Sequence, residues 1–294
     1  MWRPSRAIGA SIALHAAAVG LLCVRPAWWP LLLSAVVANH ALLTFAVLSP
    51  RSRLLGPNLS RLPAGAGEAV GLTFDDGPDP AVTPRVLDIL ARAGVTASFF
   101  CIGIRARAHP TLVQAIAAAG HSVENHSLTH PLGFASRMPP GLRREVGGAQ
   151  MILTSLAGRP ARFFRAPFGF RSPALDFVLA RAGLRHVAWT RRGYDTVCRD
   201  PAVVLRRLLR GVAAGDILLL HDGNGARTVQ GDPVVLEVLP ALLAALAARR
   251  LRPMSLPDAI DGAAAAEGCA ARTRASGADA SMSAADCPAR IGNE

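Results

Sequence analysis

The chain has 294 residues, enough for one large domain with extensions and a substantial apolar core. Its formal net charge is +12, yet all 32 basic side chains are arginines and only 5% of the residues are aromatic. No basic stripe interleaved with stacking aromatics accompanies this charge, so the composition argues against a nucleic-acid partner. The arginine-rich surface is better explained by codon bias, with some attraction to anionic membrane lipid.

Two apolar segments fill the first fifty residues. Ala7–Val24 and Ala27–Leu48 contain few polar residues, and each is near the roughly 20 residues that a helix needs to cross a bilayer. A turn is expected at Pro26, with Trp28 and Trp29 at the membrane interface. The sequence therefore predicts a membrane anchor, in its simplest form a helical hairpin. A signal peptide, or a single span, is the alternative.

Arginines flank both apolar segments. Arg3 and Arg6 precede the first, Arg51 and Arg53 follow the second, and Arg25 lies between the two. Under the positive-inside rule, this distribution favours both flanks in the cytoplasm. If only one segment spans, the same N-terminal charges place the rest of the chain outside. We expect attachment to a bacterial inner membrane, with the cytoplasmic side favoured over the periplasmic side.

From Glu68 onward, short β-rich runs alternate with amphipathic helices. The expected strands are Ala69–Phe74, Thr96–Ile102, His121–Val123, Arg162–Arg165, Arg185–Trp189, Asp216–His221 and Arg252–Leu256. The expected helices are Thr83–Ala93, Pro110–Ala119, Pro140–Leu156, Pro173–Ala182, Pro201–Ala213 and Pro233–Arg249. About seven such units in one domain favour a parallel (β/α) barrel over an open sheet.

The C-terminal stretch, Gly262–Glu294, is rich in small and polar residues and is expected to be disordered. The predicted division of the chain is an anchor at 1–50, a linker at 51–67, a globular domain at 68–261 and a tail at 262–294. The five cysteines include no C-x-x-C pair, which excludes a cysteine zinc site and a redox motif of that kind. Cys269 and Cys287, both in the tail, could pair.

A pair of carboxylates follows the first predicted strand. Two adjacent carboxylates, Asp75 and Asp76, are costly to hold together unless a cation lies beside them, although a polar turn is the plainer interpretation. His126 and His130 are four residues apart, so on a helical turn both imidazoles would face one metal ion. With Asp76 they form an Asp/His/His set that leaves a coordination position open for water, as in catalytic zinc sites.

Further polar residues occupy equivalent places along the chain. Arg165 and His221, like Asp75 and Asp76, stand at the carboxyl ends of predicted strands, and Asp195 lies in a loop that follows a strand. A lone histidine at a strand end is more often structural than catalytic. The shared placement favours a site, because active sites of α/β barrels are built from these strand ends and loops.

Four motifs occur in order: TFDDGP from Thr73, H-S-x-x-H from His126, R-x-P from Arg165, and L-x-H ending at His221. In this order and spacing they resemble the polysaccharide deacetylases of the NodB-homology family, also called carbohydrate esterase family 4. The resemblance runs from about Val70 to Pro257. It implies a distorted (β/α) barrel and a metal-dependent N-deacetylase that acts on an N-acylated glycan or glycolipid.

The resemblance also implies a role for each site residue. The implied ligands of a divalent metal, zinc first among the candidates, are Asp76, His126 and His130. Asp75 would be the general base and His221 the general acid. The main-chain N–H of Phe168 would help to hold the oxyanion. Arg165 would orient Asp75 and keep it ionised.

The chain departs from the family pattern at a few positions. Phe168 replaces a tyrosine, which a main-chain donor tolerates, and Thr196 replaces a tryptophan. Arg192 stands in the place of one aspartate, while Asp195 keeps a second one, which could still hold Arg165 in place. Arg191 and Arg192 could contact a phosphate, as in a lipid-linked sugar, or be solvated loop arginines.

These departures leave two alternatives to deacetylation of a polysaccharide or glycolipid. One is a deformylase or deacetylase of a lipid-linked amino sugar. The other is an inactive membrane module that binds glycan. The intact acid, base and ligand set argues against the inactive module, because binding alone needs neither a base nor an acid.

Overall fold

The computed structural model describes residues 4–276 of the chain. Eight parallel strands form one sheet in the order β5-β4-β3-β2-β1-β7-β6, with β8 paired to β1. Their bounds are β1 Ala69–Asp75, β2 Ser98–Cys101, β3 Ser122–Asn125, β4 Phe163–Phe164, β5 Arg185–His186, β6 Arg191–Arg192, β7 Ile217–His221 and β8 Arg252–Met254. The central strand β1 is buried along its whole length, as expected for a strand in the middle of a parallel sheet.

The sheet closes into a distorted barrel through one stretch of chain, which explains a difference from the predicted strand Arg185–Trp189. The N–H of Val187 donates to Phe164 O of β4, whereas the N–H of Thr190 donates to Ile217 O of β7. The chain therefore leaves one edge of the sheet and joins the other within three residues. The expected (β/α) barrel is confirmed, with its wall at this point held by a few hydrogen bonds instead of a long ladder.

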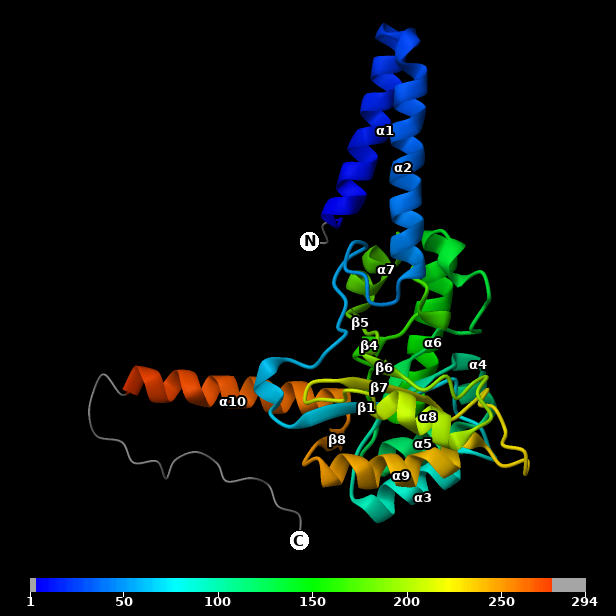
Figure 1. Cartoon of the computed structure of the whole chain (residues 1–294), viewed down its shortest axis with the longest axis vertical. Helices are drawn as coiled ribbons and strands as arrows, with labels where there is room; N and C mark the ends of the chain where they lie inside the picture. The colour runs from blue at the N-terminus through cyan, green and yellow to red at the C-terminus, as the bar shows by residue number, and fades with distance from the viewer. Residues whose placement is uncertain (1–3, 277–294) are drawn as a thin grey trace.

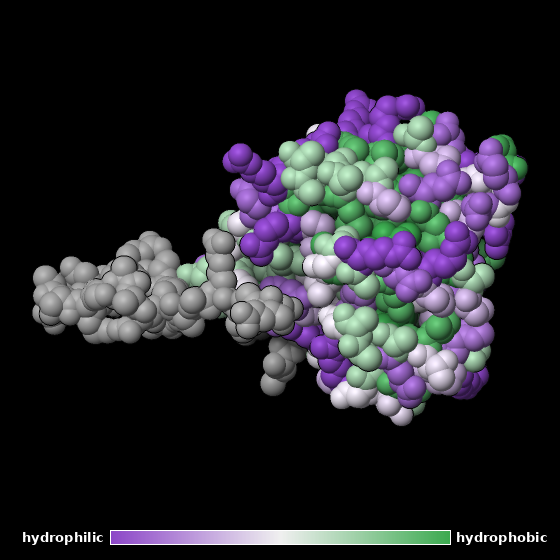
Figure 2. Space-filling model, turned by 90° about the horizontal axis from the view of Figure 1, so that it is seen from below, coloured by the Kyte–Doolittle hydropathy of each residue, from purple (hydrophilic) through white to green (hydrophobic). Residues whose placement is uncertain are grey.

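Helices pack around the outside of the barrel (Figure 1). Their bounds are α3 Thr83–Ala93, α4 Gly103–Ala108, α5 Pro110–Ala118, α6 Pro139–Ala157, α7 Leu175–Ala182, α8 Pro201–Leu209, α9 Val234–Ala248 and α10 Leu256–Ser276. The short helix α4 is absent from the sequence-based expectation. On the face farthest from the N-terminal helices, apolar residues gather among polar ones (Figure 2), where a groove runs between α3 and α9.

The helix α10 corrects the prediction of a disordered tail from Gly262, because the helix continues to Ser276. Its first turns are fixed to the barrel: Ala259 and Ala263 are buried, and Arg162 donates two hydrogen bonds to Asp261, at 2.6 and 2.8 Å. Residues 277–294, with Cys287, lie outside the described part of the chain.

The N-terminal segments form an antiparallel helical hairpin, α1 Arg6–Val24 and α2 Trp29–Leu48, joined by the short turn Pro26–Trp28. The hairpin projects from the domain with its turn at the far end (Figure 1). Both helices are long and apolar enough to cross a membrane, and polar side chains meet between them: Asn39 donates to Ser11 Oγ at 2.9 Å. The helical hairpin is as predicted from the sequence, and its crossing of a membrane stays a prediction.

The segment after α2, predicted as a linker at 51–67, packs against the barrel. Leu55 and Asn58 are buried, and the Asn58 side chain donates to Pro50 O at 2.8 Å. His186 of β5 contacts the Asn58 side chain at 3.0 Å. The hairpin is therefore joined to the domain by an ordered connection. Its chain entry and exit lie at the same end, since Ser5 Oγ donates to Leu54 O at 2.7 Å.

Candidate active site

The site lies at the carboxyl ends of the neighbouring strands β1 and β7. In the parallel register of β1 and β7, Asp75 lies opposite His221, and on the other side of β1 it lies opposite Phe100 of β2. Parallel strands place their carboxyl ends on one edge of the barrel. The expected base and acid therefore stand on neighbouring strands at the same edge, although they are 146 residues apart in the sequence.

Asp76 turns away from the strand direction. Its backbone has φ 71°, a left-handed conformation that aspartate tolerates better than most residues. Its Oδ1 lies 3.3 Å from Nε2 of both His126 and His130, is buried, and has no hydrogen bond of good geometry. Its other oxygen, Oδ2, accepts a hydrogen bond from Asn224 at 3.1 Å. One carboxylate oxygen is thus fixed and the other is aimed between two imidazoles.

The two histidines converge through a tight loop, which corrects the expected helical turn. No helix covers 126–130, and Ser127 and His130 have positive φ, 67° and 52°. Nδ1 of His126 contacts Arg165 O at 2.8 Å. Since a carbonyl oxygen can only accept, Nδ1 carries a proton, and Nε2 is the nitrogen that faces Asp76. The loop is held by Glu145, whose carboxylate accepts two hydrogen bonds from Thr129 at 2.9 Å.

The three expected ligands fit a divalent metal ion. Their ligand atoms all lie within 4.8 Å of one another, and the orphaned Oδ1 of Asp76 is among them. Burial, followed by the charge of His126, lowers the pKa of His130 to about 4, so this imidazole is neutral at pH 7. Burial would raise the pKa of Asp76, but the close His126 and the charge of His221 lower it well below its usual value. One carboxylate and two imidazoles form a donor set of the catalytic zinc type.

Arg165 fixes Asp75. The guanidinium is fully buried and donates to Asp75 Oδ1 at 2.6 Å and to Thr73 Oγ1 at 2.9 Å. It also lies 4.1 Å from the ring centroid of Phe100. Oδ2 of Asp75 remains 3.8 Å from His126 Nε2, on the side of the ligand set. One oxygen of this carboxylate is therefore held while the other faces the site.

Asp195 holds His221, which corrects the expectation that it holds Arg165. Its Oδ1 lies 2.9 Å from His221 Nδ1, and its Oδ2 accepts from the His221 main-chain N–H at 2.8 Å. Both of its oxygens are thus engaged by one residue. Burial would lower the pKa of His221, but the charge and hydrogen bond of Asp195, with the charges of Asp75 and Asp76, raise it to about 9. His221 is therefore protonated at neutral pH and able to donate a proton.

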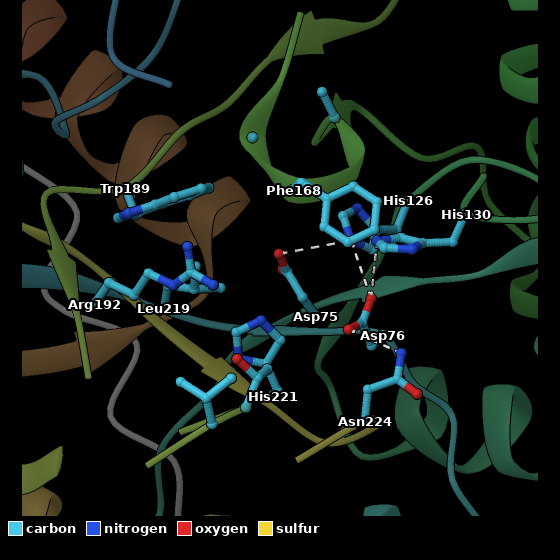
Figure 3. Close-up of a pocket in the computed structure, with 14 residues that line it drawn as sticks. Asp75, Asp76, His126, His130, Phe168, Trp189, Arg192, Leu219, His221 and Asn224 are labelled. Carbon is cyan, nitrogen blue, oxygen red and sulfur yellow. Dashed lines mark hydrogen bonds and ion pairs between the residues drawn. The ribbon is translucent and has the colours of Figure 1, made fainter. Parts of the chain in front are cut away.

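These side chains line one pocket of about 400 Å³ (Figure 3). Phe168, at the pocket wall, has φ 58°, and its ring packs on His130 with 4.7 Å between centroids. No group among the described residues accepts a hydrogen bond from the Phe168 N–H. The structure brings together the residues predicted for the site: Asp75, Asp76, His126, His130, Phe168 and His221 line the pocket, with Arg165 and Asp195 behind them.

The two adjacent arginines have different surroundings. Arg192 lines the pocket beside Trp189 and Thr196. Arg191 is turned away from it, and its Nε donates to Asp216 at 2.8 Å. Sequence reasoning missed Trp189 and Asn224 as pocket residues. Asn224 comes three residues after His221 in the same strand-end loop, which is the signal that could have found it.

Comparisons with known proteins agree with this architecture. The profile of the family described as polysaccharide deacetylase matches residues 64–187. A chitooligosaccharide deacetylase of Sinorhizobium fredii is 38% identical over 155 residues, which cover 53% of this chain and 72% of the relative. A peptidoglycan-N-acetylglucosamine deacetylase of Bacillus cereus is 31% identical over 175 residues, which cover 59% of this chain and 81% of the relative.

A solved structure is similar as well. It is a peptidoglycan N-acetylglucosamine deacetylase in complex with 4-naphthalen-1-yl-N-oxidanyl-benzamide, with a TM-score of 0.64 and 27% identity. The similarity covers 69% of this chain and 92% of that one. The profile match begins after the hairpin and ends at residue 187, so it covers the first part of the barrel, from β1 to β5.

Proposed function

The chain belongs to the polysaccharide deacetylase family, and we propose that it hydrolyses the acetamido group of an N-acetylated amino sugar in a polysaccharide or glycolipid. The observation that carries this proposal is the pairing across β1 and β7. A carboxylate with one free oxygen, Asp75, stands opposite a protonated imidazole, His221, beside an Asp/His/His set. Metal-assisted hydrolysis of an amide uses a base, an acid and a set of metal ligands of this kind together.

The pocket residues divide the work of the reaction. A divalent cation such as zinc, held by Asp76, His126 and His130, would supply Lewis acidity, lowering the pKa of water to about 7 and polarising the amide carbonyl. Asp75 accepts a proton at Oδ2 from the attacking water, because Arg165 occupies Oδ1. The main-chain N–H of Phe168, which has no acceptor among the described residues, donates to the developing oxyanion.

His221 completes the reaction. Its Nδ1 is engaged by Asp195, so Nε2 is the nitrogen that donates a proton to the departing amine. Protonation of the amine makes it a better leaving group, and the products are acetate and a free amino sugar. Asp195 acts through His221, by keeping the imidazole protonated and by fixing its orientation.

We further propose that the hairpin over residues 1–50 anchors the barrel, residues 68–261, to a bacterial inner membrane. The α1 and α2 lengths support two spans. Because both ends of the hairpin lie at the domain, Arg51 and Arg53 stand on the same side as Arg6. The positive-inside rule then favours a cytoplasmic barrel. Reporter fusions after Leu48 and at the C-terminus would measure the side of the membrane.

The test is release of acetate by the full-length protein in detergent, supplied with zinc and either N-acetylated chitooligosaccharide or peptidoglycan. Asp75→Asn is expected to lower turnover by about 10²–10⁴-fold or more, because a general base is lost, while bound zinc stays stoichiometric. The control is Asp88→Asn, an exposed carboxylate on α3, which should change neither quantity. Full turnover by Asp75→Asn would overturn the assignment of the base.

The same assay separates the alternatives. Formate in place of acetate, from a lipid-linked N-formyl amino sugar, would identify a deformylase. Absence of both metal and product would favour an inactive glycan-binding module. The favoured outcome is chelator-sensitive acetate release.

A further inference from the structure

One charged residue of the pocket lacks an opposite charge. Arg165 is paired with Asp75 and His221 with Asp195. Arg192 lines the same pocket, and no ion pair or hydrogen bond to a described residue engages its guanidinium. Its Nε is buried without a partner. The two terminal nitrogens of the guanidinium also have no partner among the described residues and, unlike Nε, are not buried, so their N–H groups are available to a molecule bound in the pocket.

Aromatic rings hold the guanidinium of Arg192 in place and leave its N–H groups without hydrogen bonds to the described residues. Its central carbon lies 5.5 Å from the ring centroid of Trp189 and 4.8 Å from that of Tyr194. Contacts with ring faces restrain an arginine but satisfy none of its N–H groups. Figure 3 shows the guanidinium extending into the pocket toward Asp75 and His221, across from His126 and His130.

The neighbouring arginine has no such freedom. Arg191 donates from Nε to the buried Asp216 at 2.8 Å and from Nη1 to Arg210 O at 2.7 Å, with a further bond to Gly211 O. Arg191 is therefore a structural residue. Of two adjacent arginines, only Arg192 has donors available to a substrate, so the pair provides its own control.

We propose that Arg192 recognises an oxyanion on the amino sugar, attached to a carbon next to the one that bears the acylamino group. This inference rests on the proposed function. An acetamido carbonyl at the Asp/His/His set places the sugar ring across the pocket, so substituents at C1 and C3 flank it. An anionic group there can be a phosphate at C1 or a carboxylate carried by an ether at C3. A planar guanidinium binds either one in bidentate fashion.

The position of the hairpin favours phosphate on a lipid-linked sugar. The N–H of Arg171 donates to Val47 O at the end of α2. Two residues earlier in the same loop, Gly169 lines the pocket and is so close to Pro50 that a Cβ at Gly169 would lie 2.9 Å from the proline ring. The pocket wall therefore touches the point where the proposed membrane helix ends. A sugar phosphate attached to a lipid has its headgroup at that level.

Three substrates with the same N-acetylglucosamine group test this inference. The first carries a farnesyl phosphodiester at C1, the second is the neutral farnesyl glycoside, and the third is that glycoside with a lactyl ether at C3. Each is given to the zinc-loaded full-length protein in detergent, and acetate release gives kcat/KM. The measured quantity is the ratio of kcat/KM for an anionic substrate to that for the neutral one. A ratio within one variant is unaffected by partial loss of folded protein.

The wild-type ratio is expected to be at least about tenfold, because a charged hydrogen-bonded pair is formed only with the anionic substrate. In Arg192→Gln the ratio should fall to within about threefold of one, with Arg192→Lys between the two. Arg191→Gln should keep the wild-type ratio. A preference for the phosphodiester identifies phosphate as the source, and a preference for the lactyl compound identifies a carboxylate.

Two results would count against the inference in different ways. A wild-type ratio near one, or an unchanged ratio in Arg192→Gln, would overturn the role of Arg192 while the deacetylase assignment stands. Failure of the zinc-loaded wild-type protein to release acetate from all three compounds, and from chitooligosaccharide, would instead overturn the proposed function.

Discussion

The two sides of the pocket are built on different principles. On the side of Asp75 and Asp76, each carboxylate has one oxygen held by a dedicated donor, from Arg165 and from Asn224, and the other oxygen facing the site. On the opposite side, Arg192 has no hydrogen-bond acceptor in the described part of the chain, and Val197 is 75% exposed. Chemistry requires a geometry fixed in advance, whereas recognition requires groups that are satisfied only when the substrate binds. In the proposed function the first side carries out the reaction, and in the proposal for Arg192 the second side selects the substrate.

The largest effect should follow from removing the centre of the fixed side. Asp76→Ala deletes the oxygen that lies 3.3 Å from both imidazoles. Bound zinc should fall below stoichiometry and kcat/KM should drop by more than about 10³-fold, because Lewis acidity and water activation are lost together. Metal analysis and acetate release on the same sample measure this. Asp88→Asn is again the control, and normal zinc content in Asp76→Ala would remove Asp76 from the ligand set.

Asp195→Asn should have the next largest effect, and it should depend on pH. The acid must be protonated, so kcat/KM falls as pH rises through the pKa of His221, which is about 9 with Asp195 in place. Without the aspartate charge, burial dominates and the pKa drops, by about 1–3 units for the loss of an adjacent opposite charge. The alkaline limb of the profile should move to lower pH by that amount.

The loss in Asp195→Asn should therefore be greater at pH 8 than at pH 6. A uniform loss across the pH range would instead indicate that Asp195 only shapes the loop. Arg191→Gln, which changes a structural residue near the same β6–β7 pair, should leave the alkaline limb where it is.

A smaller effect is expected from replacing Asn224, which donates a hydrogen bond to the proposed ligand Asp76 but is not itself a ligand. Asn224→Ala removes the donor to Asp76 Oδ2, and outer partners of metal ligands typically contribute about 10–100-fold in metal affinity. We expect a loss of about tenfold in zinc affinity, measured by competition with a chelator, with near-normal kcat at saturating zinc. Unchanged affinity would show that the Arg105 contact to Asp76 O, at 2.7 Å, suffices to hold this loop.

The fixed side was also the more predictable one. The fixed side is built from residues at or after the carboxyl ends of strands: Asp75, Asp76, His126 and His130. In a parallel sheet all of these ends lie at one edge of the barrel. The partner of Asp195 could not be predicted in this way, because the pairing of β7 with both β1 and β6 is set by tertiary packing. His126 and His130 illustrate a related limit: their i, i+4 spacing suggested a helix, but two left-handed residues bring the rings together instead.

The recognition side was less predictable because its residues resemble ordinary surface residues in sequence. Arg191 and Arg192 are adjacent and chemically identical, and only the buried Asp216 distinguishes them. Asn224, on the fixed side, was missed for the same reason, because it lies in a glycine-containing loop where asparagine is a common turn residue. Helix α10 was missed for a similar reason, since its small residues favour disorder until Ala259 and Ala263 are buried against the barrel.

The smallest effect is expected where the two sides meet, at Phe168. The proposed role of this residue belongs to its main-chain N–H, which is oriented by a backbone with φ 58°. The side chain is 41% exposed and packs on His130, so the added hydroxyl of Phe168→Tyr can remain hydrated. We expect kcat and KM within about twofold of wild type, as for exposed substitutions that leave packing intact. A tenfold change in kcat with the same KM would mean that the aromatic ring contributes to the transition state, and would place Phe168 on the catalytic side through its side chain as well as its backbone.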